Sequence, residues 1–98
     1  MARSKNRSES RRISLGDDLR IARAAEVTSL LASACDAGSV EIEAAQVERV
    51  DAAGLQALAV GISRLRKARV ACRWSGVSPA LLASAALAGL AEALELPS

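Results

Sequence analysis

The sequence predicts a single α/β domain in which about four helices pack on a small central β-sheet. Segments with strand periodicity alternate with segments of helical periodicity, and only a few residues connect one segment to the next. This order favours parallel strands joined by right-handed crossovers. A chain of 98 residues has room for one such domain and no second.

Three short segments show the alternation of apolar and polar side chains that marks a β-strand with one buried face. The first is residues 12–15, and the glycine and two aspartates that follow it have turn composition. In the second, residues 39–43, Val40 and Ile42 point to one side and two glutamates to the other. The third is residues 69–74. We therefore expect three short strands, the second with one buried and one acidic face.

Helical periodicity separates these segments. Apolar residues recur at steps of three, four and three within residues 21–35, and the same steps appear after Asp51. Both segments are therefore predicted to be amphipathic helices. The apolar stripe of the second consists of Leu55, Leu58, Ile62 and Leu65.

A third helix is predicted near the C-terminus. Ser78 is a good capping residue, and Pro79 stands where the first helical N–H would have no partner anyway. Gly89 is placed to end this helix, and a fourth, short helix is expected over residues 90–94. The inner face of the third helix is expected to consist of Leu82, Ala85 and Ala86.

The first twelve residues are strongly basic. Five arginine or lysine residues stand against Glu9, so this segment carries +4, which leaves −2 for the rest of a chain whose net charge is +2. Serine, asparagine and arginine with almost no apolar side chains are typical of disorder. We expect residues 1–11 to form a basic disordered tail and residues 12–98 to form the folded domain. Such a tail is also able to contact nucleic acid or an anionic membrane.

The composition excludes several catalytic chemistries. The chain has no histidine, which removes Ser-His-Asp and Cys-His catalysis and histidine-containing zinc sites. It has no Walker sequence and no Gly-x-Gly-x-x-Gly fingerprint for nucleotide phosphates. Cys35 and Cys72 lie far apart in apolar contexts and are expected to be reduced. No apolar run resembles a signal peptide or a membrane span, so we expect a cytoplasmic protein without cofactor, metal or enzymatic activity.

The most informative segment is residues 47–55, where strand-like residues lead into Asp51, two alanines and a glycine. Asp51 directly precedes a helical stripe and is predicted to be its N-cap, accepting hydrogen bonds from first-turn N–H groups such as those of Ala53 and Gly54. One interpretation is a helix cap and nothing more. The other is that Ala52, Ala53 and Gly54 form a low, electropositive helix start that a partner's backbone or a phosphate can approach closely.

This order of elements resembles the STAS domains, a family whose name joins sulfate transporters with anti-sigma factor antagonists. The resemblance covers roughly residues 12–97. It rests on five features taken together: the strand at residues 40–43, the spaced element Val47-x-x-Val50-Asp51-x-x-Gly54-Leu55, the helix with a basic end that follows, the strand through Trp74, and the Ser78-Pro79 helix leading to Gly89-Leu90.

The resemblance implies a cytoplasmic protein-binding module without enzymatic activity. In phospho-regulated members of the family, the residue before the glycine of this motif is a serine or threonine that an anti-sigma kinase phosphorylates, and the dephosphorylated form binds that kinase so that a sigma factor is released. Here that position is Ala53, preceded by Ala52, and neither residue can accept phosphate. The expected partner-binding residues are Asp51, Ala52, Ala53, Gly54, Leu55, Asp18 and Arg20.

Three functions are compatible with these features. The first is a bacterial signalling adaptor, either a partner-switch protein fixed in an unphosphorylated-like state or a protein of a chemotaxis-type system. The second resembles the STAS subunit of the bacterial lipid-asymmetry ABC transporter, which holds the ATPase subunit through the same helix. The third is nucleic-acid binding, which the absence of interleaved aromatic residues disfavours. Its candidate residues are Arg64, Arg66, Lys67, Arg69 and Arg73.

Overall fold

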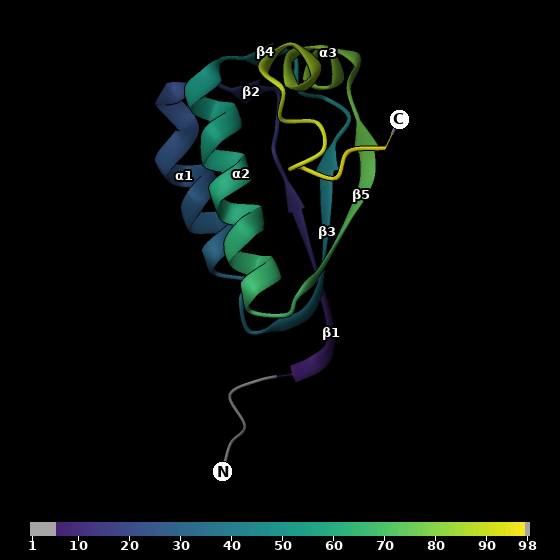
Figure 1. The fold of residues 1–98 in the computed structure, drawn as a ribbon. Coiled ribbons are helices and arrows are strands. Elements are labelled where there is room, and N and C mark those ends of the chain that lie inside the picture. The colour runs from purple at the N-terminus through teal and green to yellow at the C-terminus, as the bar shows by residue number, and fades with distance from the viewer. Residues whose placement is uncertain (1–5, 98) are drawn as a thin grey trace.

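The computed structural model describes residues 6–97 and confirms an α/β fold of the expected kind. Within these residues, three helices and five strands alternate along the chain (Figure 1). The elements are β1 (Asn6–Ser14), β2 (Asp18–Leu19), α1 (Ile21–Ala32), β3 (Ala37–Ala44), β4 (Arg49–Val50), α2 (Ala52–Lys67), β5 (Ala71–Val77) and α3 (Pro79–Ala88).

The central sheet is parallel, with the strand order β1-β3-β5. Helices α1 and α2 lie side by side over one face of this sheet, while α3 lies beyond the carboxyl ends of its strands (Figure 1). Two short strands that the sequence did not predict, β2 and β4, form a separate parallel pair near the same end. As a result, the segments that start all three helices gather at the carboxyl edge of the sheet.

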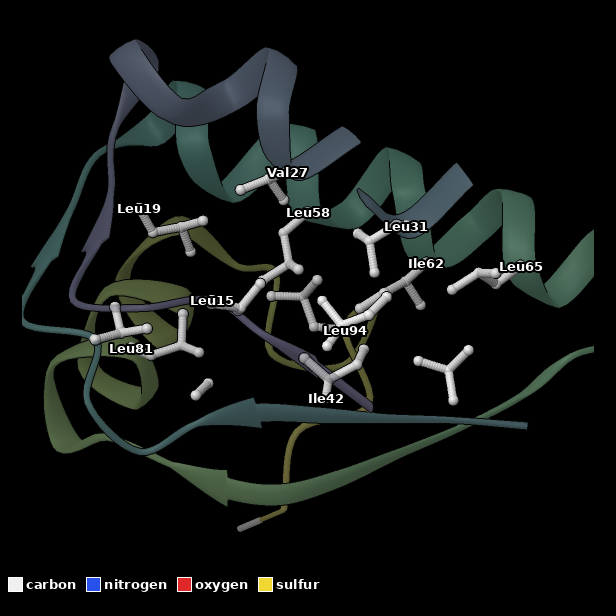
Figure 2. Close-up of a cluster of buried hydrophobic side chains, with 14 of the residues drawn as sticks. Leu15, Leu19, Val27, Leu31, Ile42, Leu58, Ile62, Leu65, Leu81 and Leu94 are labelled. Carbon is white, nitrogen blue, oxygen red and sulfur yellow. The ribbon is translucent and has the colours of Figure 1, made fainter. Parts of the chain in front are cut away.

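The core lies between the sheet and the α1–α2 layer (Figure 2). Val40 and Ile42 of β3 face this core, as their alternation predicts. On the opposite face, Glu41 stands in register between Arg12 of β1 and Arg73 of β5, so the acidic face of β3 has basic neighbours. The largest fully buried side chains are leucines, isoleucines and valines, including Leu15, Leu19, Leu31, Leu58, Ile62, Leu65, Leu81 and Leu94.

The prediction of a fourth helix is wrong, because residues 90–94 form a single turn. Leu94 N–H donates to the Leu90 carbonyl at 3.0 Å, but Glu95 then takes a left-handed conformation with φ 56° and ends the turn. Leu94 is nevertheless fully buried, and the indole Nε1 of Trp74 donates to its carbonyl oxygen at 3.1 Å. The segment therefore closes the core as a turn and not as a helix.

The inner face of α3 also differs from the expectation. Leu81 and Ala85 are buried, whereas Leu82 and Ala86 are exposed. Since α3 contains no charged residue, its sequence has no polar side that would indicate which face turns outward. The predicted cap is confirmed, because the Ser78 hydroxyl accepts from the Leu81 N–H at 3.0 Å, and Gly89 ends the helix in the left-handed region at φ 72°.

Several strand boundaries are shifted relative to the prediction, since β3 spans Ala37–Ala44 and β5 ends at Val77. Strand β1 begins at Asn6, so residues 6–11 of the predicted tail belong to a strand, while residues 1–5 lie outside the described residues. Strand β5 begins at Ala71 because Arg69 takes a left-handed conformation with φ 65° after α2. There, Val70 N–H donates to the Leu65 carbonyl at 2.9 Å, the bond of a Schellman helix end.

Candidate functional site

The N-terminus of α2 has the predicted cap. Asp51 has extended backbone angles, and its Oδ1 accepts a hydrogen bond from the Gly54 N–H at 2.8 Å. Its backbone carbonyl accepts the first helical bond, from the Leu55 N–H at 3.0 Å. The helix therefore begins at Ala52, as the apolar stripe predicts.

The second carboxylate oxygen of Asp51 binds a different helix. Its Oδ2 accepts from the backbone N–H of Ile21, the first residue of α1, at 3.0 Å. One carboxylate therefore caps α2 and satisfies an otherwise orphaned donor of α1. This contact joins residues that are 30 positions apart, and the sequence carries no signal for it.

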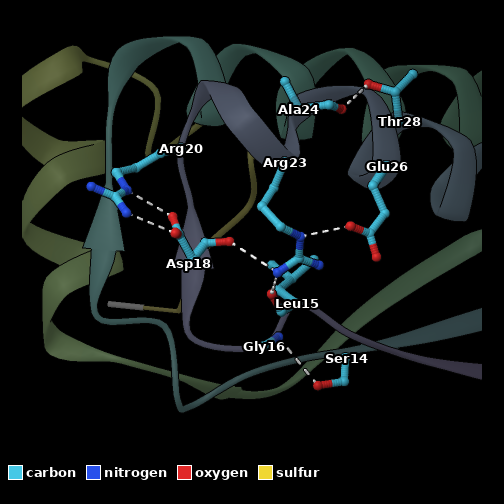
Figure 3. A network of polar contacts seen from close by, with 9 residues as sticks. All are labelled: Ser14, Leu15, Gly16, Asp18, Arg20, Arg23, Ala24, Glu26 and Thr28. Atoms are coloured by element: carbon cyan, nitrogen blue, oxygen red, sulfur yellow. Dashed lines mark hydrogen bonds and ion pairs between the residues drawn. The ribbon is translucent and has the colours of Figure 1, made fainter.

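The loop that precedes α1 is held by two arginines (Figure 3). The Arg20 guanidinium binds both carboxylate oxygens of Asp18, each at 2.9 Å. Arg23 donates from Nη1 to the Asp18 carbonyl at 3.3 Å and from Nε to the Glu26 carboxylate at 2.8 Å. Gly16 starts the loop with φ 72°, a conformation that a residue without a Cβ adopts readily.

The structure thus brings the two predicted halves of the surface together. Strand β2 pairs with β4, so Asp18 lies opposite Arg49, and the Asp51 N–H donates to the Leu19 carbonyl at 3.3 Å. Asp18 and Arg20 consequently lie next to the start of α2, although more than thirty residues separate them from Ala52.

The predicted contact residues differ in accessibility. Ala52 is exposed and Ala53 is half-buried, whereas Gly54 and Leu55 face inward and are buried. Gly54 and Leu55 therefore support the surface without forming it. Sequence reasoning missed Ile21, which is 69% exposed beside Asp51. The available signal in the sequence was a large apolar side chain at the first position of the helix that follows the acidic loop.

Hydrogen bonds set the protonation of the two acids. The backbone N–H groups of Gly54 and Ile21 lower the pKa of Asp51 below its ordinary value of 3.8. The hydrogen bond from Arg20 likewise lowers the pKa of Asp18. Both carboxylates are therefore ionised at neutral pH. Each binds donors within the same surface: Asp51 binds two backbone N–H groups, and Asp18 binds the Arg20 guanidinium.

We predict an acid-dependent loss of stability that depends on Asp51. A lowered folded-state pKa means that the ionised carboxylate stabilises the fold above the unfolded pKa near 3.8, and that this contribution is lost as the pH falls through the folded-state value. The thermal midpoint of unfolding should therefore decrease as the pH is lowered from 5 to 2.5, and this decrease should be less steep for the Asp51→Asn variant. Equal slopes for both proteins would contradict the role of Asp51 as an ionised double cap.

The rest of the described chain offers little alternative chemistry. Within residues 6–97, no three residues of the types His, Cys, Asp and Glu are grouped so that they could hold a metal ion. An open depression of about 300 Å³ lies near the other end of α2, lined by Arg66, Val70, Ala71, Cys72 and Glu95. Arg66 is paired there with Glu95 at 3.1 Å, and burial raises the pKa of the Cys72 thiol. The helices of the described segment include none with the length and apolarity needed to cross a membrane.

Comparisons with known proteins agree with this architecture. A solved structure, that of a sulfate transporter family protein from Wolinella succinogenes, superposes with a TM-score of 0.74 at 21% sequence identity, covering 87% of this chain and 70% of that one. No curated protein matches the chain. A family model described as "Mlab, STAS domain" matches residues 2–96. Since this match covers almost the whole chain, the protein belongs to the STAS domain family.

Proposed function

We propose that this protein is a non-enzymatic, cytoplasmic protein-binding module of bacterial signalling that docks its partners through the N-terminus of α2. Membership of the STAS family supports protein binding as the general role. The observation that carries the proposed location is the double cap of Asp51, which fixes the starts of α1 and α2 against each other. A fixed surface costs less entropy on binding than a mobile one.

The surface is well shaped for close contact. Ala52 and Ala53 present only methyl groups, so a partner backbone can approach the first turn of α2. Asp18 and Arg20 lie beside it as a matched ion pair, which contributes polar groups without net charge. The proposed partners are anti-sigma-type kinases and chemotaxis-type signalling proteins.

Residue 53 cannot be phosphorylated, because the alanine side chain has no hydroxyl group. In a protein with serine or threonine at this position, a phosphate group would add about two negative charges and would disrupt docking next to acidic groups. Here any control of binding must act on the partner or on another residue of this chain.

A second candidate function is that of the STAS subunit of a lipid-asymmetry-type ABC transporter, binding the ATPase. The observation that favours it is the description of the matching family, which carries the name Mlab. The solved structure with the same fold also bears a transporter title, although its 21% identity supports the fold alone. Both candidates use the same helix start and differ in the partner.

The test of both is an Ala53→Arg variant with a matched control. The long, charged side chain should block close approach, so the amount of partner recovered with the tagged protein should fall at least ten-fold. Ser63→Arg adds the same side chain on an exposed position of α2 ten residues further on, and should retain partner. If Ala53→Arg recovers the wild-type amount, the proposed surface is wrong. The identity of the partner, kinase-like protein or ATPase, decides between the two candidates.

A further inference from the structure

The outer face of α3 is an apolar stripe without a partner in the described chain. Leu87 is 90% exposed and Leu82 is 36% exposed. Ala83 and Ala86 are exposed between them. The four positions follow the steps that place residues on one side of a helix, the pattern with which helices usually face a core. In α3 this pattern faces outward, while Leu81 and Ala85 fill the interior.

The helix that carries this stripe lies next to the proposed docking surface. Helix α3 packs against β4, which ends one residue before Asp51. Ile21, bound to Asp51 through its N–H, is also exposed. The large exposed apolar residues of the described chain are Ile21, Val60, Leu82 and Leu87, and of these Val60 lies eight residues into α2, away from its start at this edge of the sheet.

The charges around this edge have an acidic excess, because Asp17, Glu48 and Asp51 outnumber Arg49, while Asp18 is paired with Arg20. Asp17 and Glu48 are exposed, and the Glu48 N–H donates to the Asp17 carbonyl at 2.8 Å, which holds the two residues next to each other. No ion pair involves either carboxylate within residues 6–97. Asp18, in contrast, is neutralised by Arg20. A binding partner gains electrostatically if it places basic residues here.

The shape of the stripe fits a helix. Ala83 and Ala86 carry only methyl groups between Leu82 and Leu87, and small residues let the axis of a second helix come close. A pair of α3 helices from two copies would bury one face of a helix only about 15 Å long. That contact alone is small beside the roughly 1,200 Å² that stable interfaces bury, whereas a partner that also docks at the start of α2 buries a larger area. A second copy would also bring two sets of the same exposed carboxylates to one interface.

We propose that the outer face of α3 and Ile21 bind a basic amphipathic helix of the partner protein. The apolar stripe of that helix packs on Leu82, Ala83, Ala86 and Leu87, and its lysine or arginine residues face Asp17 and Glu48. The inference rests on the proposed function, because it extends the surface at the start of α2 to a second contact with the same partner.

Site-specific photocrosslinking in the native host tests the inference. A p-benzoylphenylalanine is introduced at position 87, and at position 60 as the exposed apolar control on another helix. Mass spectrometry then identifies the crosslinked segment. We expect position 87 to crosslink to a segment of another protein with helical apolar periodicity and several lysine or arginine residues. A crosslink to a second copy, a segment without these features, or a yield no higher than at position 60 overturns the inference.

A pair of variants separates this inference from the proposed function. Leu87→Ser should reduce partner recovery at least ten-fold, whereas Val60→Ser should change it less than two-fold. If Ala53→Arg loses the partner and Leu87→Ser keeps it, the α3 contact is wrong and the docking at α2 stands. If Leu87→Ser loses the partner and Ala53→Arg keeps it, the docking at α2 is wrong and the α3 contact stands.

Discussion

Replacement of Gly54 by alanine is expected to destabilise the domain by about 3 kcal/mol, since a new methyl group has no room in this well-packed position. A Cβ built at Gly54 would lie 2.0 Å from the Leu19 carbonyl oxygen and 2.6 Å from its carbon. These are backbone atoms of β2, so no side-chain rotation can relieve the clash. Urea denaturation, followed by far-UV circular dichroism, measures the loss as a lower midpoint.

A second glycine provides the control. At Gly89 an added Cβ meets no atom within 4 Å, and only the left-handed φ of 72° opposes the substitution. Gly89→Ala should therefore cost about 1 kcal/mol, the penalty for a side chain in that conformation. If Gly54→Ala is no more destabilising than Gly89→Ala, then the close approach of α2 to β2 is not what Gly54 provides.

Replacement of Leu58 by alanine is expected to cost about 3–4 kcal/mol, because it leaves a cavity among side chains that relax only in part. Leu58 is fully buried on the inner face of α2, between the helix layer and the sheet (Figure 2). In a domain of 98 residues this is a large share of a total stability of roughly 5–10 kcal/mol. The free energy of unfolding from denaturant titration gives the value directly.

Val60→Ala is the matched control for this prediction. Val60 lies two residues further along the same helix and is 46% exposed, so truncation should cost less than about 1 kcal/mol. Helix propensity favours alanine at both positions, so a loss at Val60 as large as that at Leu58 would mean that burial in the core does not set the contribution of Leu58 to stability.

The helices that could be predicted well are those with a clear polar side. The stripe Leu55, Leu58, Ile62 and Leu65 is buried as its steps indicate, and both predicted caps, at Asp51 and Ser78, accept the expected type of hydrogen bond. Capping and periodicity depend on residues three or four positions apart, so the local sequence contains the relevant information.

The errors have a common origin. The exposed face of α3 could not be predicted, because a helix without charged residues, whose one polar side chain is that of Ser84, shows no clear polar side. The start of β1 was missed, since the polar segment before residue 12 gains its strand conformation by pairing with β3, with Asn6 opposite Ala37. The fourth helix was predicted over residues 90–94, but Glu95 adopts a left-handed conformation and stops the turn.

By itself, the sequence determined the order of the three strands of the main sheet and of the three helices, the apolar side of α2, the N-cap at Asp51 and the absence of a phosphate acceptor at Ala53. Only the tertiary structure decided that the same carboxylate also binds the first N–H of α1, that Asp18 and Arg20 lie beside it, and that Ile21 and Leu87 remain exposed at this edge. The reason is the distance along the sequence over which each interaction acts. Periodicity and capping depend on residues close in sequence, whereas the parallel pairing of β2 with β4 joins segments far apart in sequence.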